Sequence, residues 1–176
     1  PKANGDWRNI GHRSGVADRS LAWAPDGQKI AWFADASGEY QLVISNQEGL
    51  EKPRTIALPS PTFYFRPQWS PDSKHIAYTD TDYNLWFINV ESGQPKKVDT
   101  ERYAHPNRSL NPVWSPDSKW IAYARLLDNQ HKAIKAYNIE TGVTHQLTDG
   151  MSDATSPVWD ANGKYLYFLA STNFAL

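Results

Sequence analysis

Short runs of apolar residues alternate with polar turns along the chain. The run at residues 120–123 reads Trp-Ile-Ala-Tyr, and the run at residues 111–114 ends in Val-Trp just before a Ser-Pro-Asp-Ser turn. Apolar runs of this length, bounded by proline, aspartate and serine, favour short β-strands. We therefore expect pairs of strands that face each other across tight turns.

One decapeptide pattern occurs four times, at residues 23–32, 69–78, 114–123 and 159–168. Each copy starts with tryptophan, and successive tryptophans lie 46, 45 and 45 residues apart. A fixed period of this length, built from short strands and turns, is typical of the blades of a β-propeller. The repeat positions that we expect to be structural are Trp23, Asp26, Trp69, Asp72, Trp114, Asp117 and Trp159.

The turn inside each repeat explains its aspartate. In Ser-Pro-Asp-Ser and Ala-Pro-Asp-Gly, proline presets φ, and the aspartate side chain accepts hydrogen bonds from backbone amides further along the chain. Third strands are expected at residues 42–44, 85–88 and 134–139, and fourth strands end near Ile56, Val98 and Leu147. Four strands per period indicate one blade per repeat.

The predicted fold class is all-β: a partial or small β-propeller of about four blades, each a four-stranded antiparallel sheet. Residues 1–176 form a single propeller segment, in which residues 1–11 supply the last strand of a preceding blade. Complete blades are predicted at residues 20–58, 66–98 and 111–148, and residues 156–170 supply the first two strands of a further blade.

Such a chain would expose strand edges and inter-blade faces, which promote aggregation. Three arrangements stay open: a fragment of a longer propeller, copies that associate to close a ring, and a small four-bladed ring. We favour the fragment. Between its blades we expect the repeated tryptophans to pack with the aromatic residues that end the second strands, at Trp32, Tyr78, Tyr123 and Phe168.

Charge and composition exclude several classes of function. The 18 basic and 19 acidic residues are scattered singly or in pairs and leave a net charge of −1, so we expect no nucleic-acid surface. The absence of cysteine excludes disulfides, a thiol nucleophile and cysteine-ligated zinc. No apolar run is long enough to predict insertion into a membrane.

No motif predicts a catalytic centre, a metal site or a cofactor. Residues 150–154 read Gly-Met-Ser-Asp-Ala, which departs from a nucleophile elbow and lies between blades. The five histidines lack the spacing of a zinc motif, and the acidic runs lack the pattern of a calcium loop. We therefore expect Asp149 and Asp153 to fix a turn, and the chain not to be an enzyme by itself.

The unit Pro-x-Trp-Ser-Pro-Asp-(Ser/Gly)-Lys-x-Ile-Ala-Tyr, followed by Gly-x4-Leu-Thr at residues 142–148, resembles WD-like β-propeller repeats. Repeats of this kind occur in the tricorn protease family, in the Tol-system periplasmic propeller and in prolyl-oligopeptidase-type enzymes. Residues 120–142 and 145–174 are more specific, and they resemble the N-terminal propeller region of bacterial tricorn-like proteases.

The resemblance implies a parent protein that is a large serine peptidase acting on oligopeptides, with further propeller, PDZ and catalytic domains. This segment would be its non-catalytic propeller, for peptide access or for assembly. Its partners would be peptides or a protein, the other domains of the parent, and further copies of the chain. Two alternatives stay open: a standalone interaction propeller like the Tol-system protein, and the propeller lid of a prolyl-oligopeptidase-type hydrolase. A periplasmic or exported protein is slightly favoured over a cytoplasmic one.

Peptide-binding residues are expected on the loops at one rim, because loops on a rigid scaffold often carry binding residues. Adjacent aromatic rings can stack on peptide side chains, and arginine can pair with a peptide carboxylate. The candidate set is Phe63, Tyr64, Arg66, Tyr103, His105, Arg108 and Arg125. The alternative is that the aromatic residues cover a blade junction and the arginines are only solvated.

Overall fold

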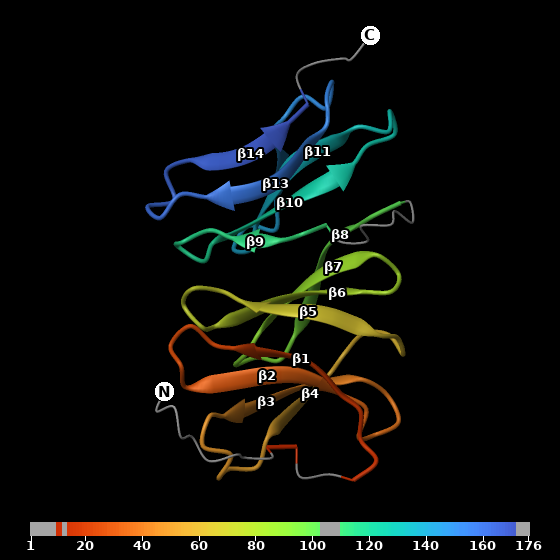
Figure 1. Cartoon of the computed structure of the whole chain (residues 1–176), viewed down its shortest axis with the longest axis vertical. Helices are drawn as coiled ribbons and strands as arrows, with labels where there is room; N and C mark the ends of the chain where they lie inside the picture. The colour runs from red at the N-terminus through yellow and green to blue at the C-terminus, as the bar shows by residue number, and fades with distance from the viewer. Residues whose placement is uncertain (1–9, 12–13, 103–109, 172–176) are drawn as a thin grey trace.

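The computed structural model describes residues 10–11, 14–102 and 110–171. All regular elements in these residues are β-strands, which confirms the all-β prediction. Figure 1 shows the strands as small sheets that follow one another along the long axis, with β1 to β4 at one end and β13 and β14 at the other.

The strands form four sheets, which we call blades 1 to 4. Blade 1 contains β1 (Asp18–Trp23), β2 (Lys29–Ala34), β3 (Gln41–Asn46) and β4 (Arg54–Ala57). Blade 2 contains β5 (Tyr64–Trp69), β6 (His75–Asp80), β7 (Asn84–Asn89) and β8 (Pro95–Thr100). Blade 3 contains β9 (Val113–Trp114), β10 (Trp120–Leu126), β11 (Lys132–Asn138) and β12 (Thr144–Gln146), and blade 4 contains β13 (Ala154–Trp159) and β14 (Leu166–Ala170).

Within each blade the strands follow chain order, and every neighbouring pair is antiparallel. This arrangement confirms the predicted series of about four propeller blades, and the described strands form an open series rather than a closed ring (Figure 1). The strand predicted in residues 1–11 lies outside the described residues, apart from Ile10 and Gly11.

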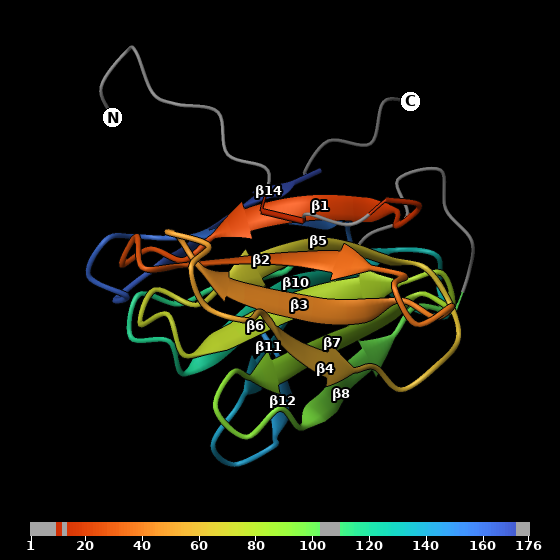
Figure 2. The same ribbon diagram turned by 90° about the horizontal axis from the view of Figure 1, so that it is seen from below.

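The first strands of the blades lie toward one edge of the molecule, and the last strands of blades 1 to 3 lie toward the other (Figure 2). Figure 2 shows β1 and β5 toward one side, with β4, β8 and β12 toward the opposite side. The strand pairs β1 and β5, and β9 and β13, are in direct contact. We call β1, β5, β9 and β13 the inner strands.

Each inner segment carries one residue with a positive φ, three positions before the repeat tryptophan. These residues are Ser20, Arg66, Asn111 and Ser156, with φ of 57°, 53°, 44° and 55°. In blades 1, 2 and 4 the residue coincides with a break in register between the first and second strands, as in a β-bulge. All four side chains are exposed, and we call them the inner row.

The apolar core lies between successive blades. Between blades 1 and 2 the rings of Phe33, Tyr64 and Tyr78 pack with centroids 5.6 to 5.8 Å apart. Between blades 2 and 3 the buried cluster includes Phe87 and Tyr123. The repeat aromatic residues therefore pack between blades wherever a described blade lies on both sides.

Two repeat aromatics are exposed near the ends of the described series. Trp23 is 54% exposed, because repeat tryptophans contact the preceding blade and no described blade precedes blade 1. Phe168 is 43% exposed, because it lies on β14, which has no third strand described beside it.

Candidate functional site

The aspartate of each repeat holds a turn, as the sequence predicts. The Oδ1 atoms of Asp26, Asp72 and Asp117 accept hydrogen bonds from the backbone amides two residues further on, at 2.9, 3.0 and 3.1 Å. In blades 2 and 3 a serine hydroxyl also donates to this carboxylate. These carboxylates therefore stabilise the turns between first and second strands.

Repeat tryptophans join complete blades by hydrogen bonds. The Nε1 atoms of Trp69 and Trp114 donate to the backbone carbonyls of Ala22 and Gln68 in the preceding blade, both at 3.1 Å. We call this contact the tryptophan bond. It fixes the distance between neighbouring first strands.

A second hydrogen bond joins the turns of the same blades. The hydroxyls of Ser73 and Ser118 accept from the backbone amides of Asp26 and Asp72 at 3.1 and 3.0 Å. Both serines have a positive φ, 58° and 61°, which non-glycine residues rarely adopt. We call this contact the serine bond, and it offsets part of the backbone strain.

Two of the predicted peptide-binding residues lie at the surface beside the inner strand of blade 2. The Phe63 ring is 47% exposed, packs against Tyr40 at 5.3 Å between centroids, and lies 5.2 Å from the guanidinium of Arg19. The Nη1 of Arg66 donates to the side-chain oxygen of Asn111 at 3.1 Å, which links the inner row across blades 2 and 3.

Burial removes Tyr64 from the peptide-binding set. Its side chain is 1% exposed, and its hydroxyl donates to the Ser60 carbonyl at 2.7 Å. Burial also raises the pKa of this hydroxyl above its ordinary value. Tyr64 is therefore a core residue between blades 1 and 2, and a peptide does not reach its ring.

Arg125 joins blade 3 to the end of blade 2. Its side chain is 13% exposed, its Nε lies 3.5 Å from Asp99, and its Nη1 donates to Glu101 at 2.7 Å. Tyr123 donates to Asp99 at 2.9 Å, and Lys135 lies 3.7 Å from the same carboxylate. A peptide carboxylate would compete with two carboxylates already bound to this arginine. The remaining candidates, Tyr103, His105 and Arg108, lie outside the described residues.

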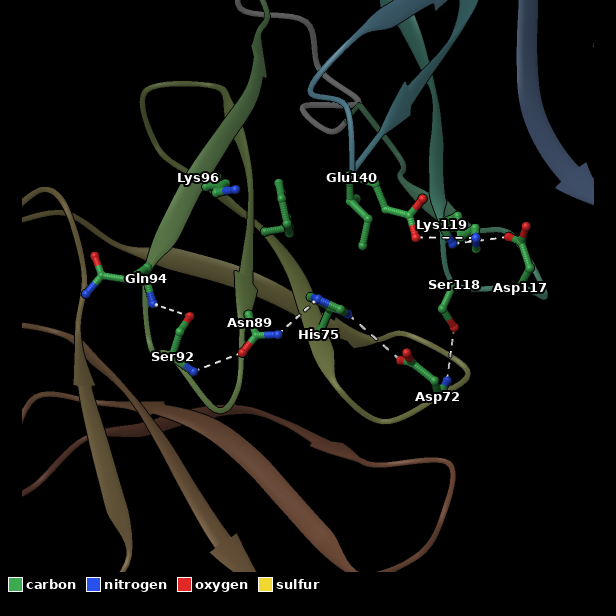
Figure 3. A pocket seen from close by; sticks show the side chains of 12 residues that line it. Asp72, His75, Asn89, Ser92, Gln94, Lys96, Asp117, Ser118, Lys119 and Glu140 are labelled. Carbon is green, nitrogen blue, oxygen red and sulfur yellow. Dashed lines mark hydrogen bonds and ion pairs between the residues drawn. The ribbon is translucent and has the colours of Figure 1, made fainter.

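A pocket of about 490 Å³ lies between blades 2 and 3, at the end that carries the aspartate turns (Figure 3). Its walls come from the start of β6, from the turn between β7 and β8, and from the turns of blade 3. Its lining includes His75, Phe87, Asn89, Lys96, Ile139 and Glu140.

His75 is held as the neutral tautomer with its proton on Nδ1. The Oδ1 of Asn89 accepts from the amides of Glu91 and Ser92, so its Nδ2 group faces His75 as a donor at 3.2 Å. The Nε2 of His75 must then accept, which assigns the proton to Nδ1. This Nδ1 is buried without a hydrogen-bond partner among the described atoms, 3.9 Å from Asp72.

The charged groups around the pocket are partly paired. Burial lowers the pKa of His75 below its ordinary value, Asp72 opposes this change, and Lys74 and Lys96 add to it. The Nζ of Lys119 lies 3.3 Å from Glu140. Lys96 is exposed and pairs with no described carboxylate, and its Nζ lies 6.0 Å from the centre of the Phe87 ring.

The sequence prediction did not include this pocket. It placed binding residues on the loops after the second and fourth strands, whereas the pocket lies at the opposite rim. A signal was present in the strand register, because basic residues occupy equivalent positions of β4 and β8, at Arg54 and Lys96. The equivalence of these two residues can be recognised only when the pairing of the strands is known.

In residues 10–11, 14–102 and 110–171, no three histidine or acidic side chains are grouped so that they could hold a metal ion. The same residues contain no helix that could cross a membrane.

The whole chain matches a known family. Residues 1–175 match the model of the tricorn protease second β-propeller domain. A tricorn protease homolog from Saccharolobus solfataricus is 28% identical over 169 residues, which cover 92% of this chain but only 14% of that protein. The chain thus spans a small part of the curated relative.

Solved structures share the fold. The crystal structure of the tricorn protease superposes with a TM-score of 0.75 at 21% identity, over 87% of this chain and 15% of that one. A putative TolB from Agrobacterium tumefaciens superposes with a TM-score of 0.60 at 19% identity, over 88% of this chain and 55% of that one. The predicted resemblance to tricorn-like proteases is confirmed, and the chain belongs to the family of the tricorn protease second β-propeller domain.

Proposed function

We propose that the chain is a non-catalytic propeller segment of a tricorn-like serine protease, and that it gives peptide substrates access to the catalytic part. The observation that carries this proposal is the inner row, which places one exposed polar side chain per blade along the inner strands. Hydroxyl, guanidinium and amide groups bind peptide backbone without requiring one sequence.

The geometry of the inner row supports contact with an extended peptide. Arg66 and Asn111 come from adjacent blades and are hydrogen-bonded to each other, so polar groups continue from one blade to the next. Phe63 and Arg19 lie beside this row and add an apolar face and a second cation. Each of these four side chains is exposed.

The test combines cleavage and binding. The 176-residue chain is incubated with a quenched-fluorescent oligopeptide, and no cleavage above the buffer rate is expected. The same peptide is titrated into ¹⁵N-labelled chain, and shifts are expected at the amides of Ser20, Arg66, Asn111 and Ser156 but not in β4, β8 and β12. Cleavage, or shifts confined to β4, β8 and β12, would contradict the proposal.

Assembly is a second role, favoured by the exposed face of blade 4. Val158, Tyr165, Tyr167 and Leu169 are 57%, 53%, 63% and 68% exposed, which is unusual for a group of large apolar side chains. We propose that this face associates with a further copy of the chain. Light scattering over a concentration series tests it: Tyr167→Lys should lower any association of the chain, and equal masses for both proteins would argue against this role.

A further inference from the structure

The two complete junctions differ at one position of the last strand. Arg54 on β4 pairs with Ile44, and Lys96 on β8 pairs with Phe87. Ile44 and Phe87 are equivalent, because each pairs with the central alanine of its repeat. Arg54 and Lys96 therefore occupy equivalent positions in their blades, and each side chain faces the next blade.

Arg54 crosses the junction between blades 1 and 2. Its Nη1 donates to the carbonyl of Val90 at 2.5 Å, and its Nη2 donates to the carbonyl of Glu91 at 2.8 Å. Both carbonyls belong to the turn between β7 and β8. A side chain at Gly93 would place its Cβ 3.1 Å from Nη2, so glycine gives the guanidinium room in this turn.

The matching turn of blade 3 has the same conformation. The Oδ1 atoms of Asn89 and Asn138 each accept from the amides two and three residues further on, at 3.0 and 2.9 Å in both turns. Gly93 and Gly142 close the turns with φ of 68° and 72°. The two carbonyls that follow Asn138 therefore have the orientation of the two that Arg54 binds.

Between blades 2 and 3 no arginine reaches these carbonyls. Lys96 is the shorter residue and lies over the Phe87 ring, and no described residue donates a hydrogen bond to the carbonyl of Ile139 or Glu140. The pocket of about 490 Å³ lies at this place and is lined by Lys96, Ile139 and Glu140 (Figure 3).

We propose that this pocket binds the guanidinium of an arginine side chain carried by a peptide. The planar guanidinium presents two parallel N–H groups to the carbonyls after Asn138, in the way that Arg54 does one junction earlier. Glu140 adds a carboxylate, and Phe87 and Ile139 contact the apolar stem. This binding is separate from peptide contact along the inner row.

The charges favour a cation over an anion. The pocket is lined by the carboxylates of Asp72, Asp117 and Glu140 against the two ammonium groups of Lys96 and Lys119, and His75 is neutral in the tautomer assigned above. Because Lys96 is exposed and has no ion-pair partner among the described residues, little opposes its displacement by a better-fitting guanidinium.

The test is an NMR titration of the ¹⁵N-labelled 176-residue chain with acetyl-Gly-Arg-Gly-amide. Shifts are expected at the amides of Glu140, Thr141 and Gly142, with a dissociation constant on the order of 1 mM for a single side chain. The matched peptide with citrulline, which is neutral and of the same shape, should bind about tenfold more weakly. Equal binding of the two peptides would overturn the proposal.

Two reciprocal substitutions sharpen the test. Lys96→Arg should fill the pocket from within and weaken binding at least about tenfold. Arg54→Lys should create a second site, with new shifts at Ser92 and Gly93. Lys97→Arg is the matched control, because Lys97 lies over Trp86 and does not line the pocket. Unchanged binding in Lys96→Arg, with folded spectra for all variants, would also refute the site.

Discussion

The junction between blades 2 and 3 and the junction between blades 3 and 4 use the same repeat but differ in their hydrogen bonds. At the first, Trp114 and Ser118 make the tryptophan bond and the serine bond. At the second, the Nε1 of Trp159 is buried with no partner among the described atoms, and Gly163 stands where the serine would be. The apolar pattern therefore stacks the blades, while two side-chain positions set the strength of each junction.

The serine position shows how serine and glycine differ in energy in this turn. Ser118 keeps a φ of 61° and gains a hydrogen bond to the next turn, whereas Gly163 adopts a φ of 69° freely and lacks the hydroxyl. A left-handed conformation costs a non-glycine residue about 1 kcal/mol, which is similar to the net value of one hydrogen bond. The serine therefore adds a specific contact between the turns of neighbouring blades rather than a large gain in stability.

The largest expected effect separates two tryptophans at the same repeat position. Trp69→Ala should lower the free energy of unfolding by about 3–5 kcal/mol, because it removes a buried ring and a tryptophan bond. Trp23→Ala is the matched control, with an expected cost below about 1 kcal/mol since its ring is 54% exposed. Urea unfolding measures both costs. Equal costs would show that a repeat tryptophan contributes as much at the end of the described series as at a junction.

A smaller effect isolates the tryptophan bond from the packing of the ring. Trp114→Phe keeps an aromatic ring but leaves the Gln68 carbonyl without its donor, so we expect a loss of about 1–2 kcal/mol. Trp159→Phe removes an N–H that has no partner among the described atoms, so its cost should be about 1 kcal/mol smaller. If the two substitutions cost the same in urea unfolding, the difference between the junctions is not in this bond.

The serine bond should contribute less. Ser118→Ala loses the hydrogen bond and keeps the positive φ, with an expected cost of about 1 kcal/mol, and Ser118→Gly should cost less because glycine relieves the backbone. At the other junction, Gly163→Ser has room, since the nearest atom to an added Cβ is a Pro116 carbon at 3.5 Å. The free energy gained from the new serine bond and the strain of the positive φ should nearly cancel. The melting temperature should therefore stay close to that of the wild type.

The smallest expected effect is a dependence on pH from the junction between blades 2 and 3. Burial lowers the pKa of His75 in the folded chain below its ordinary value of 6.5, so the unfolded state takes up the proton first. The contribution of His75 to the free energy of unfolding is therefore constant above about pH 6.5 and decreases as the pH falls below it.

Urea unfolding at pH 7 and pH 5 measures this contribution by difference. His75→Gln should lose less stability between these two values than the wild-type chain. His145→Gln is the matched control, because it removes an exposed histidine and retains His75, and it should behave like the wild type. A His75→Gln variant with the full wild-type decrease would assign the pH dependence to other groups.

The sequence predicted the repeating architecture because its turns and apolar runs are local signals. The aspartates of the turns bond the amides that turn chemistry implies, and four strands recur in each complete repeat. Tyr64 shows the limit of such signals: it stands between exposed Phe63 and half-buried Phe65 in the chain, yet it faces the core. Its burial follows from the bulged strand that carries it, and bulges have no reliable sequence pattern.

The pocket could not be predicted for a similar reason. Arg54 and Lys96 are equivalent only through strand register, and a shift in the pairing of β7 with β8 hides this equivalence in the sequence. The distance between a side chain and the carbonyls of the next blade also depends on how blades stack. A binding site between two repeats can therefore be recognised only in the structure, even where each repeat is recognisable in the sequence.

The tryptophan bond and the serine bond join only adjacent blades, so cooperativity along this chain passes from neighbour to neighbour. A blade with one weak junction can open while the others stay folded, because the contacts between described strands of different blades join adjacent blades. Amide exchange would then follow a gradient, with the fastest exchange in blade 4 and the slowest in blade 2, which is joined by both bonds on either side.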